Sequence, residues 1–387
     1  MYNAKSIKLM IVDDSMVFCR FLKEHLPKMN ERIEVVGYSM NAFDAMKKIS
    51  SLKPDVISLD IEMPGMNGIE FLKKLLPEHR IPVILVSSLN VSVFDALSYG
   101  AVDFVKKPDM SKGYTTESFA RSLAAKIVMA STASVKVPHN ILMNDSATSS
   151  TAKSESEPSR REPSLSAGAH TSRVHINLPK LAAGQLKIKN PHAPKLKNTV
   201  IALGASTGGT EATLEVLRDL PSDTPGIVVT QHMPEGFTAM YAERLNRLCA
   251  MQVKEAKNGD QIHQGQVLIA PGGDYHLKVS KKGINYYVNC VPGSKVNGHR
   301  PSVDVLFYSV AETVRSDGIG IILTGMGSDG AEGLLAMRQK GSFTIGQDKE
   351  SCVVYGMPMV ANQIGAVCTE APCSRIATLL VNHLNTL

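Results

Sequence analysis

A serine, a histidine and an aspartate that lie far apart in this sequence form a set of residue types that can hydrolyse an ester. Each follows a short apolar run, and the three are Ser206, His232 and Asp329. A serine hydroxyl is a poor nucleophile at neutral pH, so a histidine must take its proton and a carboxylate must orient that histidine. The backbone N–H of Met326, which stands between two glycines, is a candidate donor to the oxyanion of such a reaction. The pattern predicts nucleophilic acyl transfer.

A second group of residues, in the N-terminal third, has the types needed for phosphoryl transfer. Three carboxylates, a hydroxyl and an ammonium follow apolar runs there: Asp13, Asp14, Asp60, Ser87 and Lys107. Clustered carboxylates repel one another, and Mg²⁺ relieves that repulsion while leaving positions for phosphate oxygens. An aspartate in this cluster can attack a phosphoryl group, with Lys107 neutralising the charge and Ser87 donating a hydrogen bond. Either of the first two acids alone could simply cap a helix, so the prediction rests on the combination.

Both groups need a fold that brings distant residues to one edge. In the first 130 residues, apolar runs alternate with amphipathic stretches, and the runs are 7–12, 33–36, 56–59, 83–86 and 102–105. This alternation predicts an α/β domain with a doubly wound parallel sheet. Because ligands bind outside the carboxyl ends of parallel strands, residues that follow the runs are expected to converge there.

The alternation resumes after residue 198. The expected strands are 200–203, 226–230 and 319–323, and the expected helices are 210–220, 237–248, 303–315 and 330–340. A strand-rich middle, with runs 266–269, 276–280 and 284–289, predicts an antiparallel excursion. The second domain is therefore expected to be α/β as well, doubly wound and mostly parallel.

The segment between the two domains has a different composition. Residues 131–197 are rich in Ser, Ala, Thr, Lys and Pro, which predicts a disordered, flexible linker between domains 1–130 and 198–387. The 387-residue chain has a net charge of +6, and this linker contains ten basic and four acidic residues, which is the whole excess. Neither domain then has the basic excess of a nucleic-acid binder, so no nucleic acid is expected as a partner.

The segments and motifs that the sequence lacks predict the cellular compartment and the need for cofactors. No apolar run reaches the roughly eighteen residues that span a bilayer, and the N-terminus does not look like a signal peptide. We therefore expect a cytoplasmic protein without membrane insertion. The six cysteines are scattered with no C-x-x-C pair, which argues against a zinc site or a disulfide framework. The serine chemistry is expected to need no cofactor.

Each member of the serine group also has a simpler interpretation. The segment Gly204–Gly209 could hold a phosphate or dinucleotide, although it lacks a G-K-[ST] ending and no acid ends the next strand. His232 could be structural, Asp329 could cap a helix, and His383 is a less favoured alternative histidine. The alternative function is non-catalytic: the first domain would regulate a second, output domain that binds a nucleotide or a partner.

Residues 6–130 resemble the receiver domain of two-component response regulators, which is flavodoxin-like. The resemblance rests on Asp13-Asp14, Asp60-Ile-Glu-Met-Pro-Gly, Ser87-Ser88 and Lys107-Pro108. It implies that a histidine kinase phosphorylates Asp60, that Ser87 and Lys107 contact the phosphoryl group, and that the Lys107–Pro108 bond can be cis. The implied Mg²⁺ ligands are Asp13, Asp14, Asp60 and the carbonyl of Glu62.

Residues 198–387 resemble the catalytic domain of the chemotaxis protein-glutamate methylesterases, which is Rossmann-like. The matching segments are 204–209, 231–234, 270–276, 299–304 and 324–330. The resemblance implies that Ser206, His232 and Asp329 form a triad that hydrolyses glutamate methyl esters on chemoreceptors and deamidates receptor glutamines. A receiver fused upstream is that family's architecture. It implies a phosphorylation-activated hydrolase in which the unmodified receiver obstructs the Ser206 site.

Overall fold

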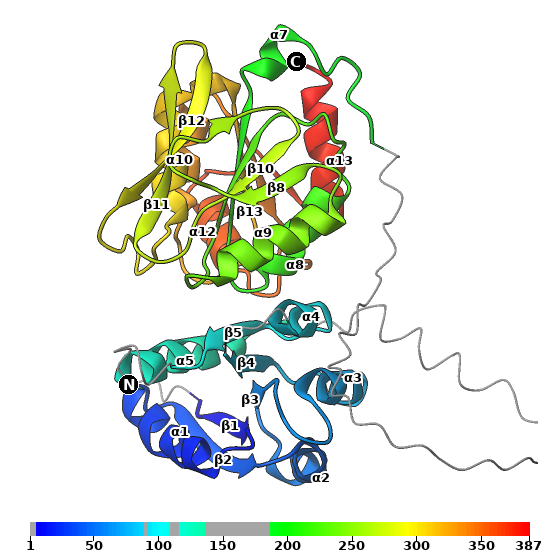
Figure 1. Cartoon of the computed structure of the whole chain (residues 1–387), viewed down its shortest axis with the longest axis vertical. Helices are drawn as coiled ribbons and strands as arrows, with labels where there is room; N and C mark the ends of the chain where they lie inside the picture. Colours follow the sequence, from blue (N-terminus) through cyan, green and yellow to red (C-terminus); the bar gives the residue numbers. More distant parts are fainter. Residues whose placement is uncertain (1–4, 89–91, 109–115, 136–185) are drawn as a thin grey trace, which may run out of the picture.

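The protein consists of two α/β units that lie one above the other in Figure 1. The structure is a computed structural model, and it describes residues 5–88, 92–108, 116–135 and 186–387. Each unit has its own parallel sheet with helices packed against it. The predicted fold class is therefore confirmed for both units.

The N-terminal unit contains a five-stranded parallel sheet in the order β2-β1-β3-β4-β5. Its strands are β1 (Ile7–Val12), β2 (Ile33–Ser39), β3 (Val56–Asp60), β4 (Val83–Ser87) and β5 (Asp103–Lys106). Its helices are α1 (Met16–Met29), α2 (Ala42–Leu52), α3 (Gly68–Glu78), α4 (Ser92–Ser98) and α5 (Thr116–Ala130). Every residue of β3 and β4 is buried, as expected for strands covered on both faces.

Local sequence explains where several of these helices begin. The side chains of Ser15, Asn41 and Asn67 each accept a hydrogen bond from a backbone N–H three residues later. Such N-caps satisfy amide groups that have no partner inside the helix. Ser15 thus starts α1 directly after Asp13 and Asp14, which leaves these two acids at the carboxyl end of β1.

The C-terminal unit contains a seven-stranded sheet in the order β15-β14-β13-β6-β7-β10-β8, and all its pairings are parallel. Its strands are β6 (Val200–Ala205), β7 (Ile227–Gln231), β8 (Gln252–Glu255), β10 (Gln266–Ile269), β13 (Gly318–Ile322), β14 (Phe343–Gln347) and β15 (Thr369–Ala371). The predicted antiparallel excursion is a separate three-stranded sheet of β9 (Gln261–Ile262), β11 (Tyr275–Lys282) and β12 (Asn285–Pro292). The assignment of run 266–269 to this excursion was wrong, because the run is β10 of the parallel sheet.

Helices cover this second sheet as well. They are α7 (Pro194–Lys197), α8 (Gly209–Arg218), α9 (Phe237–Leu248), α10 (Val303–Thr313), α11 (Ala331–Gln339), α12 (Met357–Gln363) and α13 (Cys373–Leu384). A 3₁₀ turn spans Arg315–Asp317. The sequence did not predict β8, β9, β14, β15 or α12, because these elements are short and their apolar patterns do not stand out. None of the helices in the described ranges is long and apolar enough to cross a bilayer.

The linker prediction was too long at its C-terminal end. Residues 186–197 pack on the second unit: Ile188 and Leu196 are buried, and Gln264 donates hydrogen bonds to the carbonyls of Pro191 (2.8 Å) and Asp223 (2.6 Å). Two well-spaced apolar residues in a basic, proline-containing segment give little periodic signal, which explains the error. At the other end of the predicted linker, residues 131–135 are also described, and Ser134 N donates to Val353 O (2.9 Å) of the second unit. Residues 136–185 lie outside the described residues.

The two units meet through α4 and β5 of the first and α8 and α9 of the second (Figure 1). The rings of Phe104 and Phe237 lie 4.6 Å apart and those of Phe94 and Tyr241 lie 5.6 Å apart. All four side chains are buried. The interface therefore has an aromatic centre.

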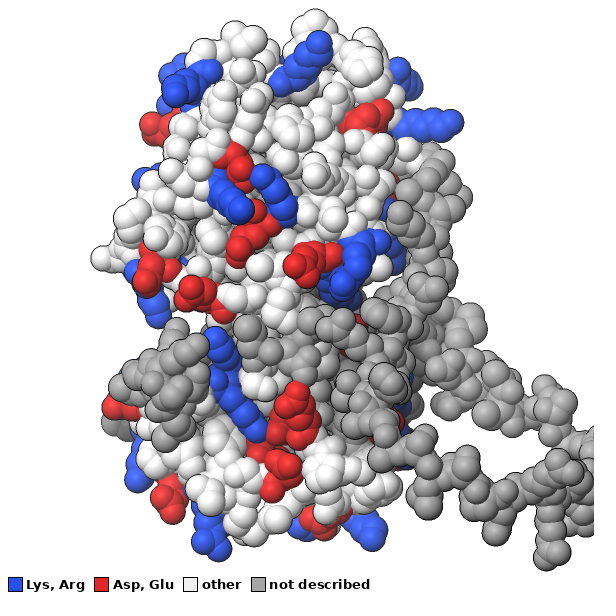
Figure 2. All heavy atoms as spheres, viewed as in Figure 1, with Lys and Arg blue, Asp and Glu red and all other residues white. Residues whose placement is uncertain are grey.

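Charged side chains of both signs are mixed over one face of the two units (Figure 2). On the face drawn in Figure 2, Lys and Arg alternate with Asp and Glu over both units. This mixture agrees with the charge balance that the sequence shows for the two domains.

Candidate functional site

His232 and Asp329 form a close, buried pair at the carboxyl edge of the second sheet. His232 follows β7 and Asp329 follows β13, and the distance from His232 Nε2 to Asp329 Oδ2 is 2.8 Å. The His232 side chain is 8% exposed and that of Asp329 is 1% exposed. Nδ1 of His232 is buried and has no hydrogen-bond partner among the described residues. If Nε2 donates to Asp329, the lone pair on Nδ1 is available to accept a proton.

Ser206 lies beside this pair, in the turn between β6 and α8. His232 N donates to Ala205 O (3.1 Å), Gln231 Nε2 donates to Ser206 O (2.8 Å), and Ser206 N donates to Thr324 O (3.0 Å). These bonds tie three strand ends together around the serine. No hydrogen bond joins its hydroxyl to His232 in the described part of the chain. Catalytic hydrogen bonds are often long before substrate binds, so the arrangement is compatible with acyl transfer.

Asp329 is held by several donors from one loop. Its Oδ1 accepts from Ser302 Oγ (2.7 Å) and Asn297 Nδ2 (2.9 Å), and its Oδ2 accepts from Val303 N (2.7 Å). Burial alone would raise the pKa of Asp329, but His232 and these side-chain hydrogen bonds outweigh it and hold the pKa well below its usual range. Asp329 is therefore a carboxylate that can stabilise a cation on His232.

Two backbone amides beside Ser206 are suitable for an oxyanion. The N–H groups of Met326 and Thr207 donate no hydrogen bond within the described ranges. Thr207 directly follows Ser206 at the start of α8, where unpaired amides favour negative charge. The sequence predicted Met326 but missed Thr207, which it could have found as the residue after the nucleophile.

His299 contacts His232 and was not predicted as a site residue. The two rings are stacked with centroids 3.7 Å apart and planes inclined by 5°. Burial, together with the neighbouring His232, lowers the pKa of His299 to about 4. His299 is therefore neutral at neutral pH and presents a flat, uncharged surface to the other ring.

The glycine-rich turn is filled by protein atoms. A Cβ added to Gly204 would lie 2.1 Å from Val303 Cγ1, and one added to Gly209 would lie 2.4 Å from Gln231 Oε1. These glycines permit close packing of the protein on itself. This explains the pattern without a nucleotide and weakens the phosphate-loop interpretation.

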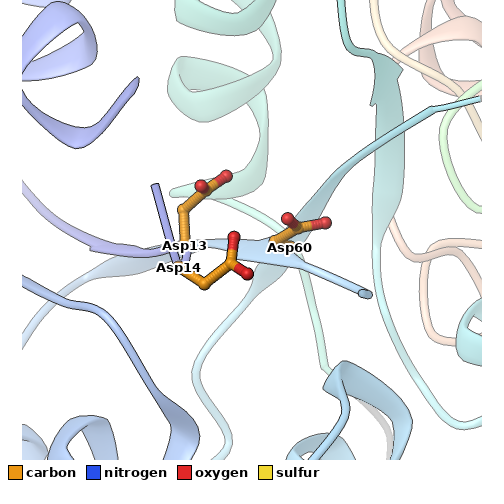
Figure 3. Close-up of side chains that lie close together, drawn as sticks. All are labelled: Asp13, Asp14 and Asp60. Carbon is orange, nitrogen blue, oxygen red and sulfur yellow. The ribbon is translucent and has the colours of Figure 1, made fainter. Parts of the chain in front are cut away.

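The predicted carboxylate cluster is present in the first unit. Oxygen atoms of Asp13, Asp14 and Asp60 lie within 4.8 Å of one another at the carboxyl edge of the sheet (Figure 3). Asp13 and Asp60 are buried and Asp14 is exposed. Lys107 Nζ lies 2.7 Å from Asp13 and 2.6 Å from Asp60. Hard carboxylate oxygens with one open side suit a magnesium ion.

The electrostatics of this pocket agree with phosphoryl chemistry. Burial raises the pKa of Asp60, although Lys107 opposes the shift. Burial would lower the pKa of Lys107, but its hydrogen bonds to Asp13 and Asp60 outweigh that effect and raise it. Ser87 Oγ is buried and has no hydrogen-bond partner in the described residues, so it is available to a phosphoryl oxygen. Glu62 N donates to Asp60 Oδ1 (3.2 Å), which brings Glu62 beside the cluster.

Several other expectations are settled by local contacts. The backbone has a cis bond at Arg300–Pro301, and Lys107–Pro108 is not among the cis bonds of the described chain. His383 stacks on Phe343 at 4.0 Å, and Asp329 is paired with His232. His383 is therefore not the triad partner of that carboxylate.

A hydrogen bond between the two units reaches the serine turn. Thr207 Oγ1 donates to Asp103 Oδ2 (2.6 Å), and Lys126 Nζ lies 2.6 Å from Asp103 Oδ1. Asp103 and Lys126 belong to the first unit. The first unit therefore places a carboxylate against the residue next to Ser206.

These features define a class of protein in which a response-regulator receiver fold is joined to a serine-type hydrolase fold. A family model described as response regulator receiver domain matches residues 9–115, and one described as CheB methylesterase matches residues 201–380. The chain belongs to the protein-glutamate methylesterase/protein-glutamine glutaminase family.

Two relatives support this assignment over the whole chain. The Syntrophomonas wolfei protein-glutamate methylesterase/protein-glutamine glutaminase 2 is 46% identical and covers 99% of each chain. The corresponding protein of Syntrophotalea carbinolica is 42% identical and covers 98% of each chain. The crystal structure of the Thermotoga maritima CheB methylesterase catalytic domain is 37% identical, with a TM-score of 0.47, over 48% of this chain and 98% of that chain.

Proposed function

We propose that this protein is a phosphorylation-activated hydrolase that removes methyl groups from glutamate methyl esters of chemoreceptors and deamidates receptor glutamines. The observation that carries the proposal is the 2.8 Å His232–Asp329 pair, which the bond from His232 N to Ala205 O (3.1 Å) places next to the Ser206 turn. Family membership supports the substrate class, because the relatives are named for both reactions. We expect the protein to act in the cytoplasm.

The reaction proceeds in two halves. Ser206 Oγ attacks the ester carbonyl carbon while His232 Nδ1 takes the serine proton. The tetrahedral intermediate expels the methoxy group, which takes that proton from His232 and leaves as methanol. Water then attacks the Ser206 acyl ester with His232 again as base, releasing glutamate and regenerating the hydroxyl. With glutamine as substrate the leaving group is ammonia, and the product is the same.

Backbone amides stabilise the negative charge that develops in both halves. The N–H of Met326 and that of Thr207 serve as oxyanion donors, since neither has another partner in the described chain. Loss of one such donor typically lowers kcat by about 10²–10³-fold. The proposed esterase chemistry uses these protein groups and no cofactor.

The receiver supplies the control. A chemotaxis histidine kinase donates a phosphoryl group to Asp60. Asp13, Asp14, Asp60 and the Glu62 carbonyl would hold Mg²⁺, which would neutralise charge on the transferring group. Lys107 and Ser87 contact the phosphoryl oxygens. The Ser87 hydroxyl, which has no hydrogen-bond partner among the described residues, and the shared Lys107 ammonium support these roles.

The position of the receiver explains how it would control the esterase. Unmodified, it covers the Ser206 turn through Asp103 and the aromatic contacts of Phe104. β5 ends at Lys106, directly before Lys107, so a change at phosphorylated Asp60 reaches the interface through a single strand. Phosphorylation weakens the interdomain packing and lets receptor helices reach Ser206.

Methanol release from methylated receptor membranes tests the proposal. Wild-type protein should release methanol faster with a phosphodonor, Ser206→Ala should release none, and Asp60→Ala should keep basal release but lose stimulation. Labelling of Ser206 by a phosphonate probe should require His232. Unchanged release by Ser206→Ala would refute the mechanism, and full stimulation of Asp60→Ala would refute the proposed control.

A further inference from the structure

We infer that the turn Val296–His299 is a positioning element of the esterase site, in which Asn297 fixes the Asp329 carboxylate that orients His232. This inference rests on the proposed roles of Ser206, His232 and Asp329. Asn297 lies on a connection between β12 and α10, and it is not a residue that ends a strand of the main sheet.

The backbone of the turn is tightly defined. Val296 N donates to His299 O (3.0 Å), and His299 N donates to Val296 O (2.9 Å). The two central residues have positive φ, 52° at Asn297 and 82° at Gly298. Asn-Gly is the pair that such two-residue turns favour, because both residues tolerate left-handed backbone. The turn therefore holds Asn297 in one defined place.

The Asn297 side chain joins two buried carboxylates. Its Nδ2 lies 2.9 Å from Asp329 Oδ1 and 2.7 Å from Asp304 Oδ2. An amide nitrogen has two N–H donors, which matches two acceptors. Asp304 is also fixed by Gly333 N, which donates to its other oxygen (2.7 Å). Asn297 thus separates two carboxylates that would otherwise face each other and ties Asp329 to a rigid neighbour.

The same turn also contacts the histidine. His299 stacks on His232 at 3.7 Å, so one four-residue turn touches both members of the His232–Asp329 pair. Asn297 as a residue is exposed, with its Nδ2 directed at buried oxygens. Removing this amide therefore alters hydrogen bonding at the site without opening a cavity in the core.

The decisive variant is Asn297→Gly, which keeps a residue that accepts positive φ and removes the side chain with its amide. We expect kcat for methanol release by the full-length, phosphodonor-stimulated protein to fall about 10–100-fold, as for small misplacements of catalytic groups. KM should stay near the wild-type value, whereas the melting temperature should fall, because two hydrogen bonds to charged groups are lost. Arg315→Gly is the matched control, since Arg315 is also exposed and has positive φ (59°) but lies in the 3₁₀ turn after α10.

A pH profile separates positioning from mere folding. Without the Asn297 donor, more of the Asp329 charge acts on His232, so the acid limb of kcat/KM should move to higher pH. The other charged or titratable groups near this pair are His299, Asp304, Lys126 and Lys295, and all remain in the variant. Asn297→Asp, which keeps the size but replaces donors by acceptors, should lose at least as much activity.

The outcomes are distinguishable. A wild-type kcat and an unmoved acid limb in Asn297→Gly would overturn the inference while Ser206→Ala remains inactive. Equal losses of activity in Arg315→Gly would overturn it as well. If Asn297→Gly does not fold, a fully active Asn297→Asp would overturn it instead. Activity in Ser206→Ala would show that the proposed function itself is wrong.

Discussion

Lys107 is shared between two acids in the receiver, and this single ammonium sets the charge of the phosphoacceptor pocket. It lies within 2.7 Å of both Asp13 and Asp60. The positive charge compensates these carboxylates, and it also repels a divalent cation bound to the same oxygens.

Lys107→Met therefore has two opposite effects. Mg²⁺ should bind about tenfold more tightly, because a cation next to its ligands is gone. Stimulation of methanol release by a phosphodonor should nevertheless disappear, since the phosphoryl group loses its partner. Isothermal titration with Mg²⁺ and the methanol assay measure the two effects. Lys106→Met, the adjacent lysine, is the control, and equal effects in it would contradict the role of Lys107.

The metal requirement can be tested independently. Removing Mg²⁺ with EDTA should abolish stimulation by the phosphodonor and leave basal methanol release unchanged, because only the receiver is proposed to use the ion. Loss of basal release on chelation, restored by Mg²⁺, would show that the esterase site also depends on metal.

His299 makes stability depend on pH. Its pKa is lowered from 6.5 to about 4 in the folded protein, so between these values the unfolded chain binds more protons. The contribution of His299 is complete above about pH 6.5 and is lost as the pH falls towards 4. His299→Phe removes the titration and keeps a flat ring. The melting temperature of the variant minus that of the wild type should be higher at pH 5 than at pH 7.5. An equal difference at both pH values would contradict burial of a neutral His299.

Sequence reasoning found the residues that stand at strand ends. Ser206, His232 and Asp13 were predictable because apolar runs mark the strands and polar residues follow them. Asn297 and His299 were not predictable in the same way. They lie in a connection whose path depends on the turn at Gly298, and no pattern in the sequence shows which neighbours that turn meets.

At the scale of elements, the loop after β13 is held against the serine turn by close backbone packing. A Cβ added to Gly325 would lie 2.3 Å from Met357 Sδ and 2.7 Å from Ser206 Cβ. Gly325 N donates to Val354 O (3.1 Å), and Met357 N donates to Gly325 O (2.7 Å). The loop with the Met326 amide thus depends on the segment before α12.

Gly325→Ala should therefore displace both the nucleophile and the oxyanion donor. We expect a stability cost of about 1–3 kcal/mol from overpacking and a fall in kcat of about 10²-fold from misplaced groups. Denaturant unfolding measures the loss of stability, and methanol release measures the fall in kcat. Gly259→Ala, where the new Cβ meets nothing within 4 Å, carries only the cost of its positive φ. Similar kcat values for the two variants would show that the loop adapts.

The long, periodic elements were predicted and the short ones were not. The strands of the first sheet and helix α9 agree with the sequence patterns to within a few residues. β14 and β15 were missed, and they extend the sheet beyond β13 on the side opposite β6. β15 is a short, partly exposed edge strand, and β14, although buried, includes Thr344 and Gln347, so both sequences contain little apolar pattern.

At the scale of the whole molecule, one receiver carboxylate connects the two units at the active site. Asp103 accepts from Thr207 and is paired with Lys126, and it is 9% exposed. No sequence pattern indicated this contact, because it depends on how two independently folded surfaces meet.

Asp103→Ala should raise methanol release in the absence of a phosphodonor. A hydrogen bond to a charged group contributes about 1.5–3 kcal/mol, so the docking equilibrium should shift about 10–100-fold and basal activity should rise by up to that factor. Asp55→Ala is the control, since Asp55 pairs with Lys5 and Lys8 outside this interface. Basal activity equal to that of the wild type would indicate that Asp103 does not restrain the esterase.

The aromatic centre of the interface has a consequence for the activated protein. If phosphorylation displaces the receiver as proposed, Phe94 separates from Tyr241 and Phe104 from Phe237, and each ring pair is worth about 0.5–1.5 kcal/mol beyond its area. The four rings then become exposed to solvent. In the proposed mechanism, the step that uncovers the nucleophile therefore also exposes apolar surface to water.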